Sequence, residues 1–214
     1  MTPPTAHGAP MHSPQRHLID GTDYYWRFLH PSEFAAHCDA LISIYSQAMG
    51  LPAEKSRRAF WQRCTTHPGF LSVAAFSEQH TIGVAFGYLA ATTDNWYRQV
   101  HYGLVEHSEA RLDTQQRFPQ LSHYFELSEI HVHPEYQGHG VGRAMLVGLS
   151  QRTQAEAIML STPEVEGENN NAFGLYRHLG FYDVLRDFHF PGDPRAFAIL
   201  RAQLPLKSAA PDSC

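Results

Sequence analysis

HPEYQGHGVGR, residues 133–143, is the stretch from which the fold of this chain is best predicted. An apolar-rich run at residues 125–132 precedes it, and apolar residues spaced three and four apart follow it from Val141 to Leu149. These patterns predict a strand before the glycines and a helix after them. Alternating glycines at a helix N-terminus leave main-chain N–H groups uncovered at the positive end of the helix dipole. The stretch therefore predicts a concave site for an anion such as a pyrophosphate.

The spacing of the glycines indicates which phosphate-binding motif is present. The P-loop pattern is absent because Arg143 and Ala144 follow the last glycine, and the dinucleotide fingerprint requires a different spacing. The pattern present is Gln137-x-x-Gly140-x-Gly142. It resembles Q/R-x-x-G-x-G/A, the loop that binds the acyl-CoA pyrophosphate in the GCN5-related N-acetyltransferase (GNAT) family. The alternative is a plain strand-to-helix turn that binds no ligand.

A second segment carries the same resemblance. Residues 169–181, NNNAFGLYRHLGF, resemble the N-x-x-A-x-x-L-Y-x-x-L-G-F segment of the family. They predict a helix with an asparagine N-cap and with Gly180 as its left-handed stop. A strand predicted at residues 157–162 separates the two segments, in the order that the family shows. The resemblance covers roughly residues 25–204.

The rest of the chain predicts an α/β domain. The segment at residues 94–122 is polar with embedded aromatic residues, and we expect an irregular or partly helical insertion there. Strands interleaved with helices argue for a mixed sheet. The resemblance implies the GNAT-type acyl-CoA N-acyltransferase fold, a mixed central sheet of about seven strands with about four helices. The other predicted strands are 24–29, 71–76, 81–89, 181–190 and 196–201, and the other predicted helices are 31–49 and 53–64.

Length and composition predict one domain with flexible ends. The 214 residues suit a single N-acetyltransferase domain at residues 22–205. Residues 1–21 are rich in Pro, His and Gly without periodicity, and they predict a flexible N-terminal arm. Residues 206–214 predict a flexible C-terminal tail. Exposed C-terminal strands would be compatible with a homodimer, but the oligomeric state stays open.

Charge and cysteine content exclude several classes of partner. A net charge of −5 argues against a nucleic-acid-binding surface, which would be basic. No apolar stretch has membrane-spanning length, and no signal peptide is predicted. The three cysteines are too few and scattered for a disulfide framework. We therefore expect a cytoplasmic protein that binds neither nucleic acid nor membrane.

The resemblance implies acetyl-CoA as the co-substrate. The glycine loop would hold its pyrophosphate, and main-chain groups of the preceding strand would pair with the pantetheine arm as an added strand. The 15 histidines form no recognisable metal-ligand spacing with acidic or cysteine partners, so no metal is expected. The residues predicted to bind the cofactor are Ile130, His131, Val132, Gln137, Gly138, His139, Gly140, Val141, Gly142, Arg143 and Asn169.

Two carboxylates on the strand before the loop are candidates for the general base. Under strict alternation, Glu126 shares a face with Ile130 and Val132, whereas Glu129 lies on the other face. A bulge would exchange the faces downstream of it, and bulges are common near active sites. By the resemblance, Glu126 stands where histone acetyltransferases carry their base, and Glu129 stands where several small-molecule members carry an acidic residue. We favour Glu126 slightly, with Glu129 contacting the substrate; a surface ion pair is the alternative for either one.

The candidate general acid is Tyr176, whose hydroxyl could protonate the departing thiolate. On its helix alone, Tyr176 could equally be a core residue. Asn169, or its neighbours Asn170 and Asn171, would bind the pantetheine or cap the helix.

The function predicted is acetyl-CoA-dependent transfer of an acetyl group to an amine, by direct transfer in a ternary complex. We expect no cysteine near the predicted site, which disfavours a covalent acyl-enzyme. The insertion and bulky aromatic residues favour a small-molecule acceptor. Two alternatives remain, a non-catalytic acyl-CoA-binding or sensing domain and an acyltransferase that uses a different acyl group.

Overall fold

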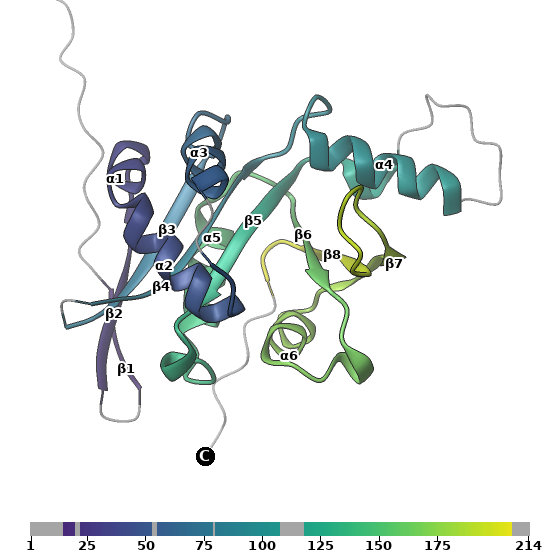
Figure 1. The fold of residues 1–214 in the computed structure, drawn as a ribbon. Coiled ribbons are helices and arrows are strands. Elements are labelled where there is room, and N and C mark those ends of the chain that lie inside the picture. Colours follow the sequence, from purple (N-terminus) through teal and green to yellow (C-terminus); the bar gives the residue numbers. More distant parts are fainter. Residues whose placement is uncertain (1–14, 20–21, 53–54, 79, 108–117, 207–214) are drawn as a thin grey trace, which may run out of the picture.

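The computed structural model describes residues 15–19, 22–52, 55–78, 80–107 and 118–206. Its centre is one mixed sheet of eight strands in the order β1-β2-β3-β4-β5-β6-β8-β7 (Figure 1). All neighbouring strands pair antiparallel except β5 and β6, which are parallel. The strands are β1 Gln15–Ile19, β2 Thr22–Leu29, β3 Leu71–Ser77, β4 His80–Leu89, β5 Tyr124–Val132, β6 Ala157–Pro163, β7 Tyr182–Phe188 and β8 Phe197–Gln203.

Helices cover both faces of the sheet. Side chains of α1 to α3 pack with Ala74, Val84 and Phe86 on one face. Side chains of α5 and α6 pack with Val73, Ala75 and neighbouring residues on the opposite face, as the two-residue alternation of strands requires. Helix α4 packs on strands β6 to β8. The helices are α1 Pro31–Ala36, α2 Cys38–Met49, α3 Lys55–Cys64, α4 Asn95–His107, α5 Val141–Arg152 and α6 Asn171–His178.

The predicted fold class is confirmed, and some details differ. The helix expected from Pro31 is two helices that meet at His37, and it ends as expected at Gly50, which has a φ of 63°. The segment at 94–122 contains a regular helix of 13 residues, α4, where an irregular or partly helical insertion was expected; residues 108–117 lie outside the described part. Strand β1 lies within residues 1–21, for which a flexible arm was expected. Because it pairs with β2, the sheet has eight strands where about seven were expected.

Strand β5 carries the feature that positions the site. Its pairing with β4 shifts between Phe86, which lies opposite Glu129, and Gly87, which lies opposite Leu127. Ser128 is therefore the extra residue of a β-bulge. A Cβ atom at Gly87 would lie 2.0 Å from the Glu126 carbonyl oxygen, so only glycine fits opposite this bulge.

Candidate functional site

The bulge places both candidate carboxylates on one face of the sheet. Glu126 lies opposite Tyr88 and Glu129 lies opposite Phe86, two positions of β4 whose side chains share a face. Without the extra residue, the two glutamates would point to opposite faces. The strict alternation considered for the sequence is therefore wrong at this point, and the bulge alternative is confirmed.

The parallel strands β5 and β6 separate after Glu126, just before the bulge. They pair only from Tyr124 to Glu126 of β5. The His133 N–H donates to the Ile82 carbonyl at 2.8 Å, so Ile130 and Val132, which alternate with His133, direct their main-chain groups away from β4. They face the gap left by β6, as the sequence analysis expected for the pantetheine arm.

A groove of about 860 Å³ continues from this gap to the glycine loop. Tyr176 of α6 lines it, together with main-chain and side-chain atoms of β5 and α5. His139 and Asn169, both predicted to bind the cofactor, are not among the described residues that line it. The predicted cofactor residues that do line the groove are Ile130, His131, Val132, Gln137, Gly138, Gly140, Val141, Gly142 and Arg143.

The glycine loop has the conformation that an anion site needs. Gly138 and Gly140 have φ values of 79° and 78°, which favour glycine, and Gly140 is the N-cap of α5. The helical hydrogen bonds begin with the Ala144 N–H, which donates to the Gly140 carbonyl at 2.9 Å. The N–H groups of residues 141–143 are therefore not used by the helix. The side chain of Gln137 donates to the Val132 carbonyl at 3.0 Å, which ties the loop to the end of β5.

Helix α6 supplies the far wall of the groove. Its N-cap is Asn170, whose Oδ1 accepts from the Phe173 N–H at 2.8 Å. Asn170 and Asn171 line the groove, whereas Asn169 is not among the described residues that line it. Gly180 has a φ of 89°, as predicted for the residue that ends this helix.

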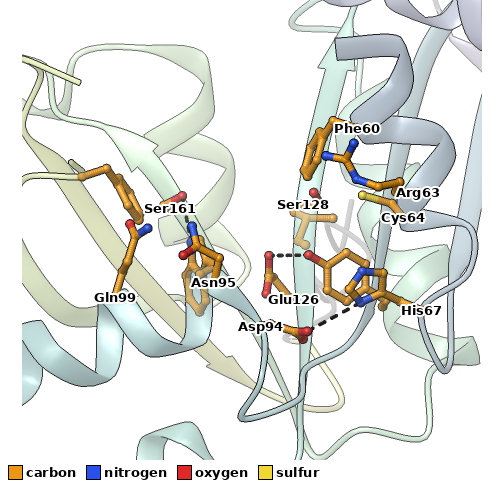
Figure 2. Close-up of a pocket in the computed structure, with 14 residues that line it drawn as sticks. Phe60, Arg63, Cys64, His67, Asp94, Asn95, Gln99, Glu126, Ser128 and Ser161 are labelled. Carbon is orange, nitrogen blue, oxygen red and sulfur yellow. Dashed lines mark hydrogen bonds and ion pairs between the residues drawn. The ribbon is translucent and has the colours of Figure 1, made fainter. Parts of the chain in front are cut away.

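A second cavity, of about 340 Å³, opens on the opposite side of the bulge (Figure 2). Helix α3 forms one wall with Phe60, Arg63 and Cys64, and helix α4 forms the other. Glu126, Leu127 and Ser128 of β5 lie between these walls. Residues 126–128 of β5 line the cavity, and Ile130 and Val132 of the same strand line the groove. One short segment of β5 therefore borders both sites.

Glu126 is buried in this cavity, with 4% of its surface exposed. Its Oε1 accepts a hydrogen bond of 2.9 Å from the Tyr88 hydroxyl, whereas its Oε2 has no hydrogen-bond partner in the described structure. Burial raises the pKa of Glu126 to about 8; the Tyr88 hydroxyl lowers it and the charge of Asp94 raises it further. A carboxyl group with this pKa can exchange a proton with an amine near neutral pH.

Glu129 makes contacts that hold helix α3 on the strand. Its Oε1 accepts from Arg57 at 2.7 Å and from the Trp61 indole at 3.2 Å. Its Oε2 lies 2.6 Å from Nε2 of His131. Glu129 is not among the described residues that line the cavity. The geometry therefore favours the ion-pair alternative for Glu129 and the base assignment for Glu126.

Tyr176 lies in the groove with 5% of its surface exposed. Burial, followed by the charge of Glu129, raises its pKa above the ordinary value of a phenol. Tyr176 also packs against Phe181 in the hydrophobic core, with 5.4 Å between the ring centroids. Its position is therefore compatible with both the acid and the core interpretation.

The cavity contains residues that the sequence analysis did not select. Tyr88 binds Glu126, and the His67 ring stacks on Tyr88 with 4.1 Å between centroids. Nδ1 of His67 lies 3.8 Å from the Asp94 carboxylate. No motif marks these residues, because Tyr88 reaches Glu126 through the β4–β5 pairing, and His67 and Asp94 come from separate segments that follow α3 and precede α4. Cys64 also lines the cavity, although no cysteine was expected near the site.

Within the described residues, no group of three or more His, Cys, Asp or Glu could hold a metal ion. None of the described helices is long and apolar enough to cross a membrane.

Comparisons with known proteins agree with this architecture. A family model described as an acetyltransferase (GNAT) domain matches residues 78–183. A GCN5-like protein acetyltransferase of Mycobacterium tuberculosis is 36% identical over 202 residues, covering 83% of this chain and 97% of that protein. A ribosomal protein bS18-alanine N-acetyltransferase of Escherichia coli K12 is 35% identical over 82 residues, which are 37% of this chain and 55% of that protein.

Solved structures share the fold. A Salmonella typhimurium protein, crystallised with its cofactor acetyl-CoA, has a TM-score of 0.56 at 18% identity and covers 89% of this chain and 99% of its own. The ribosomal-protein-S18-alanine N-acetyltransferase of Escherichia coli has a TM-score of 0.53 at 19% identity, with 89% and 98% covered. Since the Mycobacterium tuberculosis protein is similar over nearly its full length, the chain belongs to the GCN5-related N-acetyltransferase family.

Proposed function

We propose that this protein transfers the acetyl group of acetyl-CoA directly to a primary amine. The observation that carries the proposal is the position of the buried Glu126 in a cavity whose β5 lining, residues 126–128, is followed along the strand by groove-lining residues 130–132. The groove beside Ile130 and Val132 fits the cofactor, and the cavity lined by Glu126 fits the amine. The reaction would take place where the two meet, at the bulge.

The chain's own groups fit coenzyme A at several points. The N–H groups of residues 141–143 and the helix dipole are available for a diphosphate. Nε of Arg143 is buried without a partner in the described structure, and the same side chain lines the groove. Bound acetyl-CoA supplies an activated thioester. The main chain of Ile130 and Val132 would hold its amide-rich arm and direct the thioester towards the bulge.

Glu126 is proposed as the general base. An ammonium acceptor first releases one proton to solvent, and the neutral amine then attacks the thioester carbonyl. The free Oε2 of Glu126 would accept the second proton, which the nitrogen loses as the carbon–nitrogen bond forms. A carbon–nitrogen bond forms, the carbon–sulfur bond breaks, and the thiolate departs. The hydroxyl of Tyr176 is the proposed donor of a proton to that sulfur.

Cys64 does not alter the direct-transfer proposal. Its thiol is 1% exposed, and burial, with the nearby Glu126 and Glu129 charges, raises its pKa to about 12. The thiol therefore stays protonated at neutral pH and is a poor nucleophile.

The acceptor is proposed to be an amine of a protein or peptide. The sequence analysis predicted a small molecule, but two relatives are named for protein substrates, one as a protein acetyltransferase and one as a ribosomal-protein N-acetyltransferase. A cavity between two helices can admit a single amine-bearing side chain. Small amines remain an outcome of the test.

The direct test is thiol release from acetyl-CoA by the purified protein with lysine peptides and, separately, with small primary amines. Release with peptides and formation of the acetylated peptide, seen by mass spectrometry, would support the proposal. Release only with small amines would restore the small-molecule acceptor. Acetyl-CoA binding without release under every amine would favour the sensing alternative. Parallel assays with propionyl- and succinyl-CoA test the acyl-group alternative.

Replacing Tyr176 by phenylalanine should lower kcat by about 10- to 100-fold while leaving the Kd for acetyl-CoA within about twofold. The ring that packs against Phe181 is retained, and only the hydroxyl is lost. Single-turnover kinetics and calorimetric titration measure the two quantities. An unchanged kcat would leave Tyr176 as a core residue.

The pH dependence of kcat/KM should follow Glu126. Below a pH of about 8 the carboxyl group of the free enzyme is mostly protonated and cannot accept a proton. We expect kcat/KM to rise with pH and to level off above that value. A profile that levels off near pH 5 would contradict the assignment of Glu126 as the base.

A further inference from the structure

The buried end of the acceptor cavity contains two carboxyl groups, those of Glu126 and Asp94. Glu126 has an unpartnered Oε2, and it shares the cavity with Asp94, whose side chain is 11% exposed. One Asp94 oxygen accepts from the Ala91 N–H at 2.8 Å, and the other lies 3.8 Å from the His67 ring. These two carboxylates are the acidic side chains among the described residues that line the cavity. The Asp94 carboxylate therefore favours the ammonium group of an acceptor at this end, and Glu126 adds negative charge only above a pH of about 8.

The outer part of the same cavity carries a positive charge that forms no ion pair with any of the described residues. Helix α3 has three arginines, and two of them form ion pairs: Arg57 with Glu129 at 2.7 Å, and Arg58 with Asp39 at 2.6 Å. The third, Arg63, lines the cavity and is exposed, and it forms no ion pair with any residue in the described ranges. In Figure 2, Arg63 lies beside Phe60 on helix α3. His67 follows this helix and lies beside Asp94, at the other end of the same side of the cavity.

The wall between the two charged regions is uncharged. Leu127 and Cys64 are buried there, and Phe60 is 37% exposed near Arg63. Helix α4 faces this wall with Asn95, Trp96 and Gln99. An aliphatic chain can therefore lie between the carboxylates and the guanidinium group.

We propose that the cavity selects an acceptor with an amine and a carboxylate joined by an aliphatic chain, namely a lysine next to an acidic residue in a peptide. Glu126 and Asp94 receive the amine, and Arg63 binds the carboxylate and determines specificity. This inference rests on the proposed function, because it names the substrate class of the same site. An arginine–carboxylate contact at an exposed position contributes up to about 1 kcal/mol, which is about a fivefold preference.

The test compares capped lysine peptides that differ only in an aspartate or an asparagine beside the lysine, on either side. The wild type should acetylate the better aspartate peptide with a kcat/KM about fivefold higher than its asparagine counterpart. Arg63→Gln should abolish this preference, Arg63→Glu should reverse it, and Arg63→Lys should keep most of it. Because the guanidinium is exposed, 0.5 M NaCl should also weaken the preference of the wild type.

Two further variants separate a local contact from general charge. Arg98→Gln removes an exposed arginine of α4 that does not line the cavity, so the preference should remain. Asp94→Asn should lower kcat/KM for both peptides alike and leave their ratio unchanged. Equal rates on the two peptides with the wild type, or an unchanged ratio in Arg63→Gln, would overturn the inference while leaving the proposed function intact. Failure to acetylate any peptide would overturn the inference and the peptide acceptor, and the proposed acetyl transfer itself would be overturned only if small primary amines also gave no thiol release.

Discussion

Replacing Glu126 by glutamine is expected to lower kcat/KM for the amine by about 100- to 10,000-fold, the range that a positioned general base contributes. Glutamine keeps the size of the side chain and can still accept the hydrogen bond from Tyr88. It cannot take a proton from the amine. Binding of acetyl-CoA should change little, because Glu126 lines the acceptor cavity and the cofactor groove lies beyond the bulge. Steady-state kinetics and calorimetric titration measure the two effects.

The same substitution should stabilise the protein at neutral pH. In the unfolded chain a glutamate has a pKa of about 4.5, whereas folding raises the pKa of Glu126 to about 8. The stability that this residue contributes is fully present below pH 4.5 and is lost as the pH rises through about 8. Between these two values the folded state holds a proton that the unfolded state has released, so each rise in pH favours the unfolded state. Glutamine does not ionise, so the variant avoids this loss.

Thermal unfolding at several pH values checks this prediction. The Tm of Glu126→Gln should match that of the wild type near pH 4 and exceed it by several degrees at pH 8, since about 1 kcal/mol shifts the Tm of such a domain by roughly 2–4 °C. Glu129→Gln serves as the contrast, because it weakens the ion pairs with Arg57 and His131 and should lower the Tm at pH 7. A lower Tm for Glu126→Gln at pH 8 would contradict the burial argument.

Replacing Gly140 by aspartate should weaken acetyl-CoA binding by at least about 100-fold. Gly140 is the N-cap of α5 with a φ of 78°, and it lines the groove where the diphosphate is proposed to bind. An aspartate adds strain to the backbone and a negative charge beside the N–H groups of residues 141–143. Calorimetric titration with coenzyme A and with acetyl-CoA measures the loss.

Gly192→Asp is the matched control. Gly192 has a φ of 87° and open space around it, and it is not among the described residues that line the groove. An aspartate at this position therefore introduces a similar backbone strain and the same added negative charge, but it does so away from the proposed phosphate site. Its Kd for acetyl-CoA should match the wild type. Equal losses in both variants would show that strain alone, without the phosphate site, explains the effect of Gly140→Asp.

The glycine loop, the strand before it and the helices at residues 141–152 and 171–178 could be predicted because their signals are local. Glycine spacing, three- and four-residue apolar periodicity and caps such as Gly180 act within a few residues. Helix α4 was predicted only in part, because most of its residues are polar and the apolar stripe formed by Val100 and Leu104 is too short to be recognised in the sequence. Strand β1 was missed because its pairing with β2 depends on a partner outside the strand itself.

The sequence by itself determined the family and the glycine loop at the start of α5, since the backbone conformation of such a loop needs only a short run of suitably placed glycines. Tertiary structure alone decided which glutamate enters the acceptor cavity. One extra residue at Ser128 reverses the side-chain alternation of β5, and only the pairing with Gly87 of β4 shows that it is there. The juxtaposition of Asp94, Tyr88 and Arg63 around that cavity likewise depends on packing between distant segments, which no local pattern records.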